Sequence, residues 1–535
     1  MSSLRPAISR RAIQLLLAGL LVFVLGWDVW AVVQDRRLTG SDTFTPKLVE
    51  LATSLEQGQL RRWLRAEDPK GPVPAVLALP LLYAVGDGPL AARLLSVLSH
   101  GGLILLAFAL ARQIGGRRSA GLWAALLCAT SPMVFGWCRL DYPEPLLALL
   151  LLAALLLMMQ PRLPWLALGV CLALALMVKL SLAVLMLGPA LWLAVRHLHH
   201  IRQQGAWRAL LPPILCGAVF LALIAPWLLH NLQMVLVNLN DTHHELAMMG
   251  RTRTLGYLHL PTIGPLLAMA LLALAVLWSD GTRQQRWQLA LLGSCIVASL
   301  VIFLTSFTYW SRYLMPTTTV MAVVAGAGLD RAQHRLRPRV RQALGVAAAV
   351  LLTGQLAVVS LVGLPTRLPR EHYSGLLTPD RRPHDGYQRA LSALQRLKQP
   401  MLVVYDSVFA MHRTEGIDAI WRRRNLALPV IPPRDLITDY QPGQELSVLL
   451  VSGMRDPDRS ATDLSQLVSR EAWRNMLPHD TELLYYREVL SWLARQKEVR
   501  QLVSTTDPGD LRYVALQVTC DGVPPHDPAV DDEVP

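Results

Sequence analysis

The sequence predicts an α-helical protein that crosses a membrane many times and carries a C-terminal α/β domain. Hydrophobic residues make up 53% of its 535 residues, and the mean hydropathy is +0.36. Charged residues make up only 17%, against roughly a quarter in soluble domains. Runs rich in leucine and alanine dominate residues 12–364 and thin out afterwards. A large soluble helical core is disfavoured, because so many apolar runs follow one another with only short polar breaks.

The first apolar run predicts an uncleaved signal anchor. Arg5, Arg10 and Arg11 precede an apolar run over residues 12–33 that is long for a signal peptide and has no clear small-residue cleavage site. We therefore expect this run to be the first spanning helix, with its N-terminus in the cytoplasm.

The remaining spans follow from apolar runs of roughly the length a bilayer requires, about 17–25 residues. About eleven are predicted, at residues 12–33, 92–111, 119–137, 145–160, 164–178, 180–195, 209–228, 261–279, 287–307, 314–330 and 343–364. The run over residues 73–85 has two internal prolines and is short for a span. It predicts a re-entrant or juxtamembrane helix on the outer side.

Arginine placement supports this topology. Each segment expected in the cytoplasm carries arginine: the N-terminus and residues 112–118, 161–164, 196–208, 280–286 and 330–341. These segments account for much of the net charge of +13 without nucleic acid as a partner. Counting residues 73–85 as a span would place residues 112–118 outside and break the charge rule.

An odd number of spans places the C-terminal part outside, which in a bacterial cell is the periplasm. Residues 1–364 are thus the transmembrane domain, with a first outer loop over 34–91. Strand-like runs at 401–408, 445–453 and 511–520 alternate with helix-like runs at 386–398 and 482–499, which predicts an α/β domain over 365–522. The acidic, proline-rich residues 523–535 predict a disordered tail. Of the six cysteines, five lie in or beside apolar runs, so neither a disulfide framework nor a metal site is indicated.

The first outer loop contains an acid ahead of an amphipathic helix. Leu48, Leu51, Ala52 and Leu55 recur at helical spacing, which predicts a helix lying on the membrane surface, with Thr45 as its cap. Asp42 precedes its N-terminus, where the helix dipole favours the ionised carboxylate. From the local sequence, Asp42 is either a helix-capping acid or a catalytic carboxylate.

Other charged residues gather on the same predicted side. Lys70 lies between prolines, as a membrane anchor or a phosphate ligand, and Arg93 begins the next span. The second outer loop carries Arg139, Asp141 and Glu144, Lys179 interrupts a long apolar stretch, and Arg312 with Tyr313 precedes a span that begins with proline. A lysine inside an apolar stretch is costly unless it lies at the interface or faces an anion.

The fourth outer loop, over residues 229–260, offers a metal as an open alternative. Asp241, His243, His244 and Glu245 are suitable ligand types, although no spacing such as HExxH is present. Arg251 follows in the same loop.

Carboxylates and cations on one side suit chemistry on a lipid-linked phosphate at the outer leaflet. A phosphate requires the cations, and a hydroxyl under activation requires a carboxylate.

This arrangement resembles the GT-C superfamily of polyprenyl-phosphate-dependent glycosyltransferases, in particular the aminoarabinose transferases of lipid A, the protein O-mannosyltransferases and the lipopolysaccharide-core transferases. The likeness covers about residues 12–330. Asp42, with the helix after it that ends near Gly58, is similar to the acidic motif of the family. Lys70 is similar to the lysine of the family's Lys-Pro motif. Its later arginine, acid, lysine and YxxP segment match Arg93, Asp141, Lys179 and Tyr313–Pro316.

The chain departs from the family pattern at three places. Thr43 stands where many relatives have a second acid, and Gly71 replaces one proline of the lysine motif. The fourth-loop His-x-x-Arg pattern is absent, because Glu245, Leu246 and Ala247 follow His244 and Arg251 comes later.

The resemblance implies an inverting transferase that takes a sugar from a polyprenyl phosphate, namely undecaprenyl phosphate, at the outer leaflet of a bacterial inner membrane. It implies Asp42 and Asp141 as catalytic residues and Lys70, Arg93, Lys179, Arg312 and Tyr313 as phosphate ligands. Arg139, Glu144 and Arg251 are further candidate contacts. The acceptor would be lipid A, another envelope glycan or a protein. The alternatives are a flippase or transporter of a lipid-linked saccharide and an O-antigen-type ligase that uses a diphosphate-linked donor.

Overall fold

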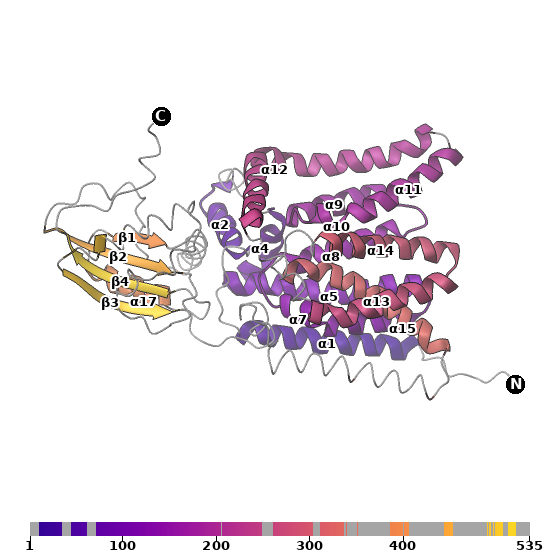
Figure 1. Cartoon of the computed structure of the whole chain (residues 1–535), viewed down its shortest axis with the longest axis horizontal. Coiled ribbons are helices and arrows are strands. Elements are labelled where there is room, and N and C mark those ends of the chain that lie inside the picture. The colour runs from indigo at the N-terminus through magenta and orange to yellow at the C-terminus, as the bar shows by residue number, and fades with distance from the viewer. Residues whose placement is uncertain are drawn as a thin grey trace. The chain divides into compact units, whose positions relative to one another are not determined.

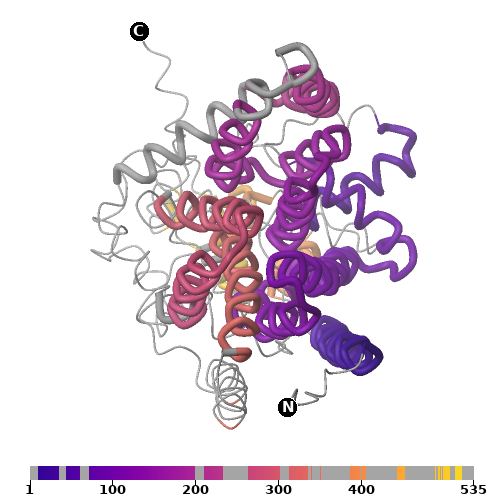
Figure 2. Tube along the Cα trace, turned by 90° about the vertical axis from the view of Figure 1, so that its right-hand side faces the viewer, coloured from indigo at the N-terminus to yellow at the C-terminus, as the bar shows by residue number. Residues whose placement is uncertain are grey.

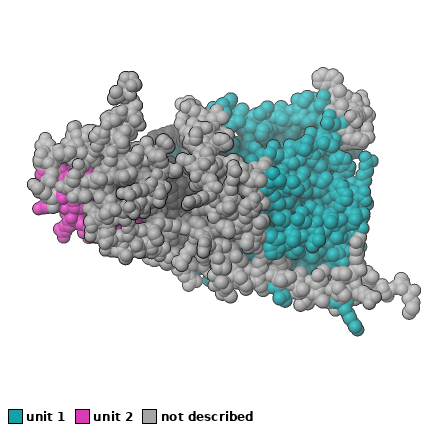
Figure 3. All heavy atoms as spheres, viewed as in Figure 1, with its two compact units in different colours: residues 1–34, 50–379 teal, residues 35–49, 380–535 magenta. Residues whose placement is uncertain are grey.

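A computed structural model of the chain describes most of the N-terminal two thirds and the C-terminal sheet. The described residues are 10–34, 44–60, 71–204, 206–248, 260–302, 311–335, 386–397, 401–405, 443–452, 498–506 and 512–520, with single positions at 339, 350, 399, 489, 492–493 and 496. Their contacts separate into two compact units (Figure 3). Unit 1 comprises residues 1–34 and 50–379, and unit 2 comprises 35–49 and 380–535.

Unit 1 is a bundle of helices (Figure 1). In chain order they are α1 (Arg10–Gln34), α4 (Val73–Val85), α5 (Gly88–Gly115), α6 (Arg118–Thr130), α7 (Pro132–Trp137), α8 (Glu144–Met158), α9 (Trp165–Val178), α10 (Leu182–Leu185), α11 (Leu187–Gln204), α12 (Ala206–Met248), α13 (Leu260–Asp280), α14 (Arg283–Ile302), the 3-10 turn η4 (Ser311–Leu314) and α15 (Met315–Arg335). Helix α2 (Thr45–Glu56) contributes residues to both units.

The predicted spans from 12–33 to 314–330 overlap these helices, with 180–195 divided between α10 and α11. Residues 303–307 of the predicted span 287–307, and all of the predicted span 343–364 except Val350, lie outside the described residues. Within the described part of the chain, four helical segments are long and apolar enough to cross a membrane: Arg10–Gln34, Gly88–Gly115, Leu210–Leu232 and Ile263–Asp280. Three shorter apolar helices accompany them, namely Val73–Val85, Glu144–Met158 and Trp165–Val178. The count of eleven spans stays a prediction.

Two further differences between the predicted and observed boundaries have a clear cause in the sequence. The run over 119–137 is split into α6 and α7, because Pro132 has no N–H to continue the first helix and suits the first turn of the next. Residues 229–248, predicted as a loop, continue α12 as helix. No glycine or proline occurs between Pro226 and Gly250 to end it. At about 1.5 Å per residue, α12 is about 65 Å long, twice the bilayer core.

Helix α15 lies at the centre of unit 1 and packs against α6, α13, α5 and α8 (Figure 2). Its residues Val320–Ala325 are fully buried. A Cβ at Gly326 would lie 2.4 Å from the backbone nitrogen of Ala124 in α6. The small residue therefore allows close approach of the two backbones, as is usual for helices in membranes.

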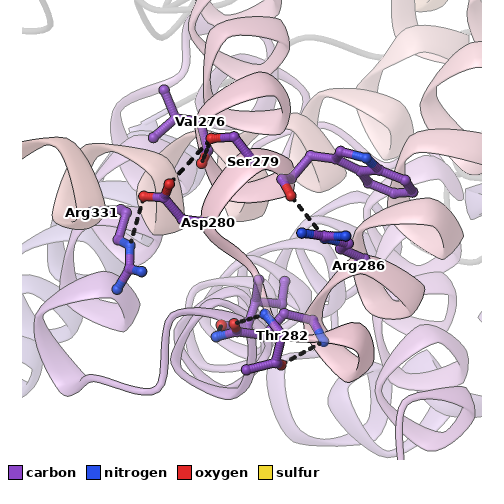
Figure 4. Close-up of polar contacts among 9 residues, drawn as sticks. Val276, Ser279, Asp280, Thr282, Arg286 and Arg331 are labelled. Atoms are coloured by element: carbon purple, nitrogen blue, oxygen red, sulfur yellow. Dashed lines mark hydrogen bonds and ion pairs between the residues drawn. The ribbon is translucent and has the colours of Figure 1, made fainter.

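Polar contacts hold the turn between α13 and α14 at the end of α15 (Figure 4). The backbone N–H of Thr282 donates to Gln285 Oε1 (2.9 Å), and the N–H of Gln285 donates to Thr282 Oγ1 (3.3 Å), which is a reciprocal cap of α14. Arg331 of α15 lies 3.6 Å from the Asp280 carboxylate. This pair is partly exposed, so it contributes at most about 1 kcal/mol.

Unit 2 contains a mixed four-stranded sheet in the order β1-β2-β4-β3 and helix α17 (Gly386–Gln395). The strands are β1 (Met401–Tyr405), β2 (Glu445–Ser452), β3 (Glu498–Thr506) and β4 (Arg512–Thr519). The pair β1–β2 is parallel, and the pairs β2–β4 and β3–β4 are antiparallel. One face packs against α17 through Tyr387 and Leu391, and the other buries Trp492.

The predicted strands at 401–408, 445–453 and 511–520 correspond to β1, β2 and β4, and the predicted helix at 386–398 corresponds to α17. Strand β3 was not predicted, and its first residues were assigned to the helix-like run 482–499. It lies at the sheet edge, has a bulge between Gln501 and Val503, and alternates weakly in hydropathy. The predicted tail 523–535 lies outside the described residues.

The helix predicted at the first outer loop is present as α2. It begins at Thr45, so its cap position falls one residue earlier, at Phe44, whose carbonyl accepts from Leu48 N. Leu48, Leu51 and Ala52 are buried.

Candidate functional site

Polar side chains in unit 1 meet where several helices begin or end. Helix α9 ends at Val178, and Lys179 follows in an extended conformation before α10. Glu144 opens α8, and Tyr313 lies in η4, directly ahead of α15. Three elements far apart in the sequence therefore supply one cluster.

The centre of this cluster is the ammonium of Lys179. Its Nζ donates to Glu144 Oε1 at 2.5 Å and lies 4.1 Å from the centroid of the Tyr313 ring. The Glu144 side chain is buried, whereas the Lys179 side chain keeps 21% exposure. A partly exposed cation beside a tyrosine is able to receive an anion.

Gly71 lies against the end of α9, which is close in sequence to Lys179 of this cluster. A Cβ at Gly71 would lie 1.5 Å from the carbonyl oxygen of Met177, two residues before Lys179. The backbone at Gly71 is thus in direct contact with the end of α9. Gly71 replaces one proline of the lysine motif, and the reason is steric. A proline ring at this position would meet the carbonyl of Met177 just as a Cβ would. Lys70, the preceding residue, lies outside the described residues.

Replacing Gly71 by alanine is expected to displace one of the two segments. The clash involves backbone on the α9 side, so we expect destabilisation at or above the usual overpacking cost of about 1–3 kcal/mol, measured by thermal unfolding in detergent. Gly217→Ala is the matched control, because a Cβ at Gly217 meets nothing within 4 Å. Equal melting temperatures for the two variants would contradict the close contact.

The other predicted site residues divide into three groups. Arg93, in α5, and Asp141, in the turn before α8, are buried. Arg139 is buried too, and its partner lies in α1, as described below. Asp42, Lys70 and Arg251 lie outside the described residues, and so do the side chains of Arg312, His243 and His244, although the backbone of the last two continues α12. Among the described residues, no three metal-binding side chains come together.

Two buried residues of the spans were missed by the sequence analysis. Asp28 in α1 accepts from Arg139 Nε at 3.0 Å and lies 2.7 Å from Nδ1 of His100 in α5. Both partners, like Asp28, are almost completely buried. The available signal was an acid inside the run 12–33 and a histidine inside the run 92–111, because ionisable residues in spans are costly and usually paired.

The six cysteines are free and buried.

Comparison with known proteins gives one family match and two similar solved structures. A family model described as dolichyl-phosphate-mannose-protein mannosyltransferase matches residues 69–230. The structure is similar to the crystal structure of ArnT from Cupriavidus metallidurans bound to undecaprenyl phosphate, with a TM-score of 0.58, 18% sequence identity, and coverage of 95% of this chain and 98% of that one. The apo structure of the same protein is similar with a TM-score of 0.53, at the same identity and coverage. No curated protein matches in sequence.

Proposed function

We propose that this chain, whose fold is that of the GT-C glycosyltransferases and whose residues 69–230 match one of their family models, is an inverting transferase that takes a sugar from a polyprenyl phosphate. The acceptor is an envelope glycan, lipid A or a protein. The reaction takes place at the outer leaflet of a bacterial inner membrane, with the N-terminus in the cytoplasm and the C-terminal domain in the periplasm.

The observation that carries this proposal is the cluster of Lys179, Glu144 and Tyr313. It presents a partly exposed cation between helix ends, in a fold that holds undecaprenyl phosphate in a similar protein. Gly71 supports the assignment, since its contact with Met177 links the segment that carries Lys70 to the same helix end.

The proposed reaction is a single displacement. The acceptor oxygen attacks the anomeric carbon from the face opposite the phosphate, and the bond between that carbon and the phosphate oxygen breaks. Asp42 takes the acceptor proton as general base, and Asp141 orients the acceptor. Lys70, Lys179, Arg312 and Tyr313 stabilise the negative charge that grows on the leaving phosphate, and Arg93, Arg139 and Arg251 are further cations of the same side.

Glu144 has a separate role in this proposal. Without substrate, it pairs with Lys179 and compensates its charge. When the phosphate binds, Lys179 exchanges part of this contact for the ligand. The exchange avoids leaving a partly buried ammonium without a counter-charge in either state.

The test is incubation of the purified protein with a radiolabelled undecaprenyl-phosphate sugar and an envelope glycolipid extract. We expect label on the acceptor and release of undecaprenyl phosphate. Donor returned intact, with movement between leaflets of a vesicle, would indicate a flippase or transporter. Transfer from a diphosphate-linked donor but not from the monophosphate would indicate an O-antigen-type ligase.

A further inference from the structure

Asp28 lies on the stripe of α1 that faces the rest of unit 1. Val24, Ala31 and Val32 are the buried neighbours at helical spacing, and α1 packs mainly against α5. Trp27 and Trp30 lie on the exposed side, with ring centroids 5.1 Å apart. Exposed tryptophans of a spanning helix are typical of the headgroup level. The carboxylate is therefore near one end of the span and directed into the protein.

The carboxylate of Asp28 has two partners from different elements. One oxygen accepts from Arg139 Nε (3.0 Å), and the other lies 2.7 Å from His100 Nδ1. Nε2 of His100 is also buried and has no hydrogen-bond partner in the described part of the chain. A buried carboxylate is costly unless it is paired and hydrogen-bonded, so this arrangement fixes all three side chains together.

Arg139 is held from a second direction by an aromatic ring. Its guanidinium carbon lies 3.8 Å from the ring centroid of Phe135 in α7, and the His100 ring meets the same phenyl ring edge-on. The guanidinium is thus fixed between a carboxylate and an aromatic face, which leaves its side chain little freedom.

Arg139 belongs to the short connection between α7 and α8, not to a helix. This connection also contains Asp141, and α8 begins with Glu144 directly after it. Backbone bonds from Arg139 N to Gly136 O and from Leu140 N to Trp137 O close the turn. The conformation of the segment that carries Asp141 is therefore tied to α1 through one side chain.

We propose that Asp28 and His100 are positioning residues, which hold Arg139 and thereby set the connection that carries Asp141 relative to the reacting groups. This inference rests on the proposed transferase function for its catalytic consequence, while its structural part stands independently. Asp28 acts through Arg139 and contacts no substrate. Misplacement of a catalytic group by about 1 Å can lower a rate by about 100-fold, so such an anchor affects the chemistry more than the binding of the donor lipid.

The experiment compares wild type with Asp28→Asn, full-length and in nanodiscs. We expect backbone amides 138–142 to exchange about tenfold faster in the variant, because the connection opens locally. We also expect kcat for sugar transfer to fall about tenfold or more, while affinity for undecaprenyl phosphate is unchanged. Asp330→Asn is the matched control, because Asp330 is a buried acid beside a histidine, His334, in the same unit but in α15.

A double-mutant cycle shows whether Asp28 acts through Arg139. If it does, adding Asp28→Asn to Arg139→Gln changes kcat by no more than about twofold, because the shared interaction is already lost. If Asp28→Asn lowers kcat equally in the wild-type and the Arg139→Gln background, the proposal is overturned. Amide exchange of residues 138–142 at the wild-type rate in Asp28→Asn would overturn it as well.

Two other results of these experiments also have a defined meaning. If the wild-type protein transfers no sugar, the proposed function fails, and hydrogen exchange alone decides the positioning role. If Asp28→Asn does not insert, the double variant Asp28→Asn/Arg139→Gln replaces it, since removing both charges avoids a buried unpaired ion. Raised exchange in the double variant supports the inference, and wild-type exchange refutes it.

Discussion

Asp42→Asn is expected to lower the rate of sugar transfer by about 10²–10⁴-fold, the usual contribution of a general base. The amide has the same shape as the carboxylate but does not accept the acceptor proton. Expression and membrane insertion should be unchanged, since an asparagine ahead of α2 also suits a helix N-terminus. Single-turnover transfer from a labelled undecaprenyl-phosphate sugar measures the effect.

The same outer loop offers a matched control in Asp87→Asn. Asp87 caps α5 through a bond from Leu90 N to its Oδ1 (3.0 Å). Asparagine is an equally good cap, so this variant should retain both stability and transfer. Near-normal transfer in Asp42→Asn would show that Asp42 is a helix-capping acid, like Asp87, and not the general base. An equal loss in both variants would point to damage of the whole loop.

Lys179→Gln is expected to weaken the binding of undecaprenyl phosphate by about 10- to 100-fold. A hydrogen bond to a charged group contributes about 1.5–3 kcal/mol, and glutamine removes the charge while keeping a donor for Glu144. Binding of the lipid without a sugar isolates this contribution from the chemical step. The measurement is displacement of a fluorescent undecaprenyl-phosphate analogue from the protein in nanodiscs.

Arg196→Gln is the control for loss of a cation elsewhere in the bundle. Arg196 donates to the carbonyls of Met158 (2.8 Å) and Gln160 (3.2 Å) at the end of α8, so its removal should lower stability and not lipid affinity. Unchanged affinity in Lys179→Gln, or an equal loss in Arg196→Gln, would be incompatible with a specific phosphate contact at Lys179.

Much of the helical fold follows from local patterns. Apolar runs such as 92–111 and 314–330 correspond to α5 and α15, because burial of a long apolar segment requires helix in a membrane. The α2 helix was also predictable from its spacing. Strand β3 was not, because an edge strand needs little apolar alternation and gains its bonds from β4. The continuation of α12 to Met248 was not predicted, because the polar composition of residues 229–248 favours a loop.

Part of the candidate site was predictable from residue type and order. Lys179 and Glu144 stood out as charges in or beside apolar stretches, and the structure brings them together. Their distance in the sequence gave no sign of this pairing. Arg139 was expected among the donor or acceptor contacts, and the structure shows that it pairs with Asp28. Asp28 was not among the predicted site residues, because one acid among many apolar residues hardly alters the mean hydropathy of a span.

The sequence by itself predicted a multi-helix membrane protein from composition and periodicity, which act over a few turns of chain. The resemblance of its motifs to the GT-C superfamily added the charged residues that are candidates for its chemistry. Only the tertiary structure decided which charges share a partner: Lys179 with Glu144 and Tyr313, and Arg139 with Asp28 and His100. The physical reason is that a buried ion depends on a partner within a few ångströms, and long-range packing of helices selects that partner.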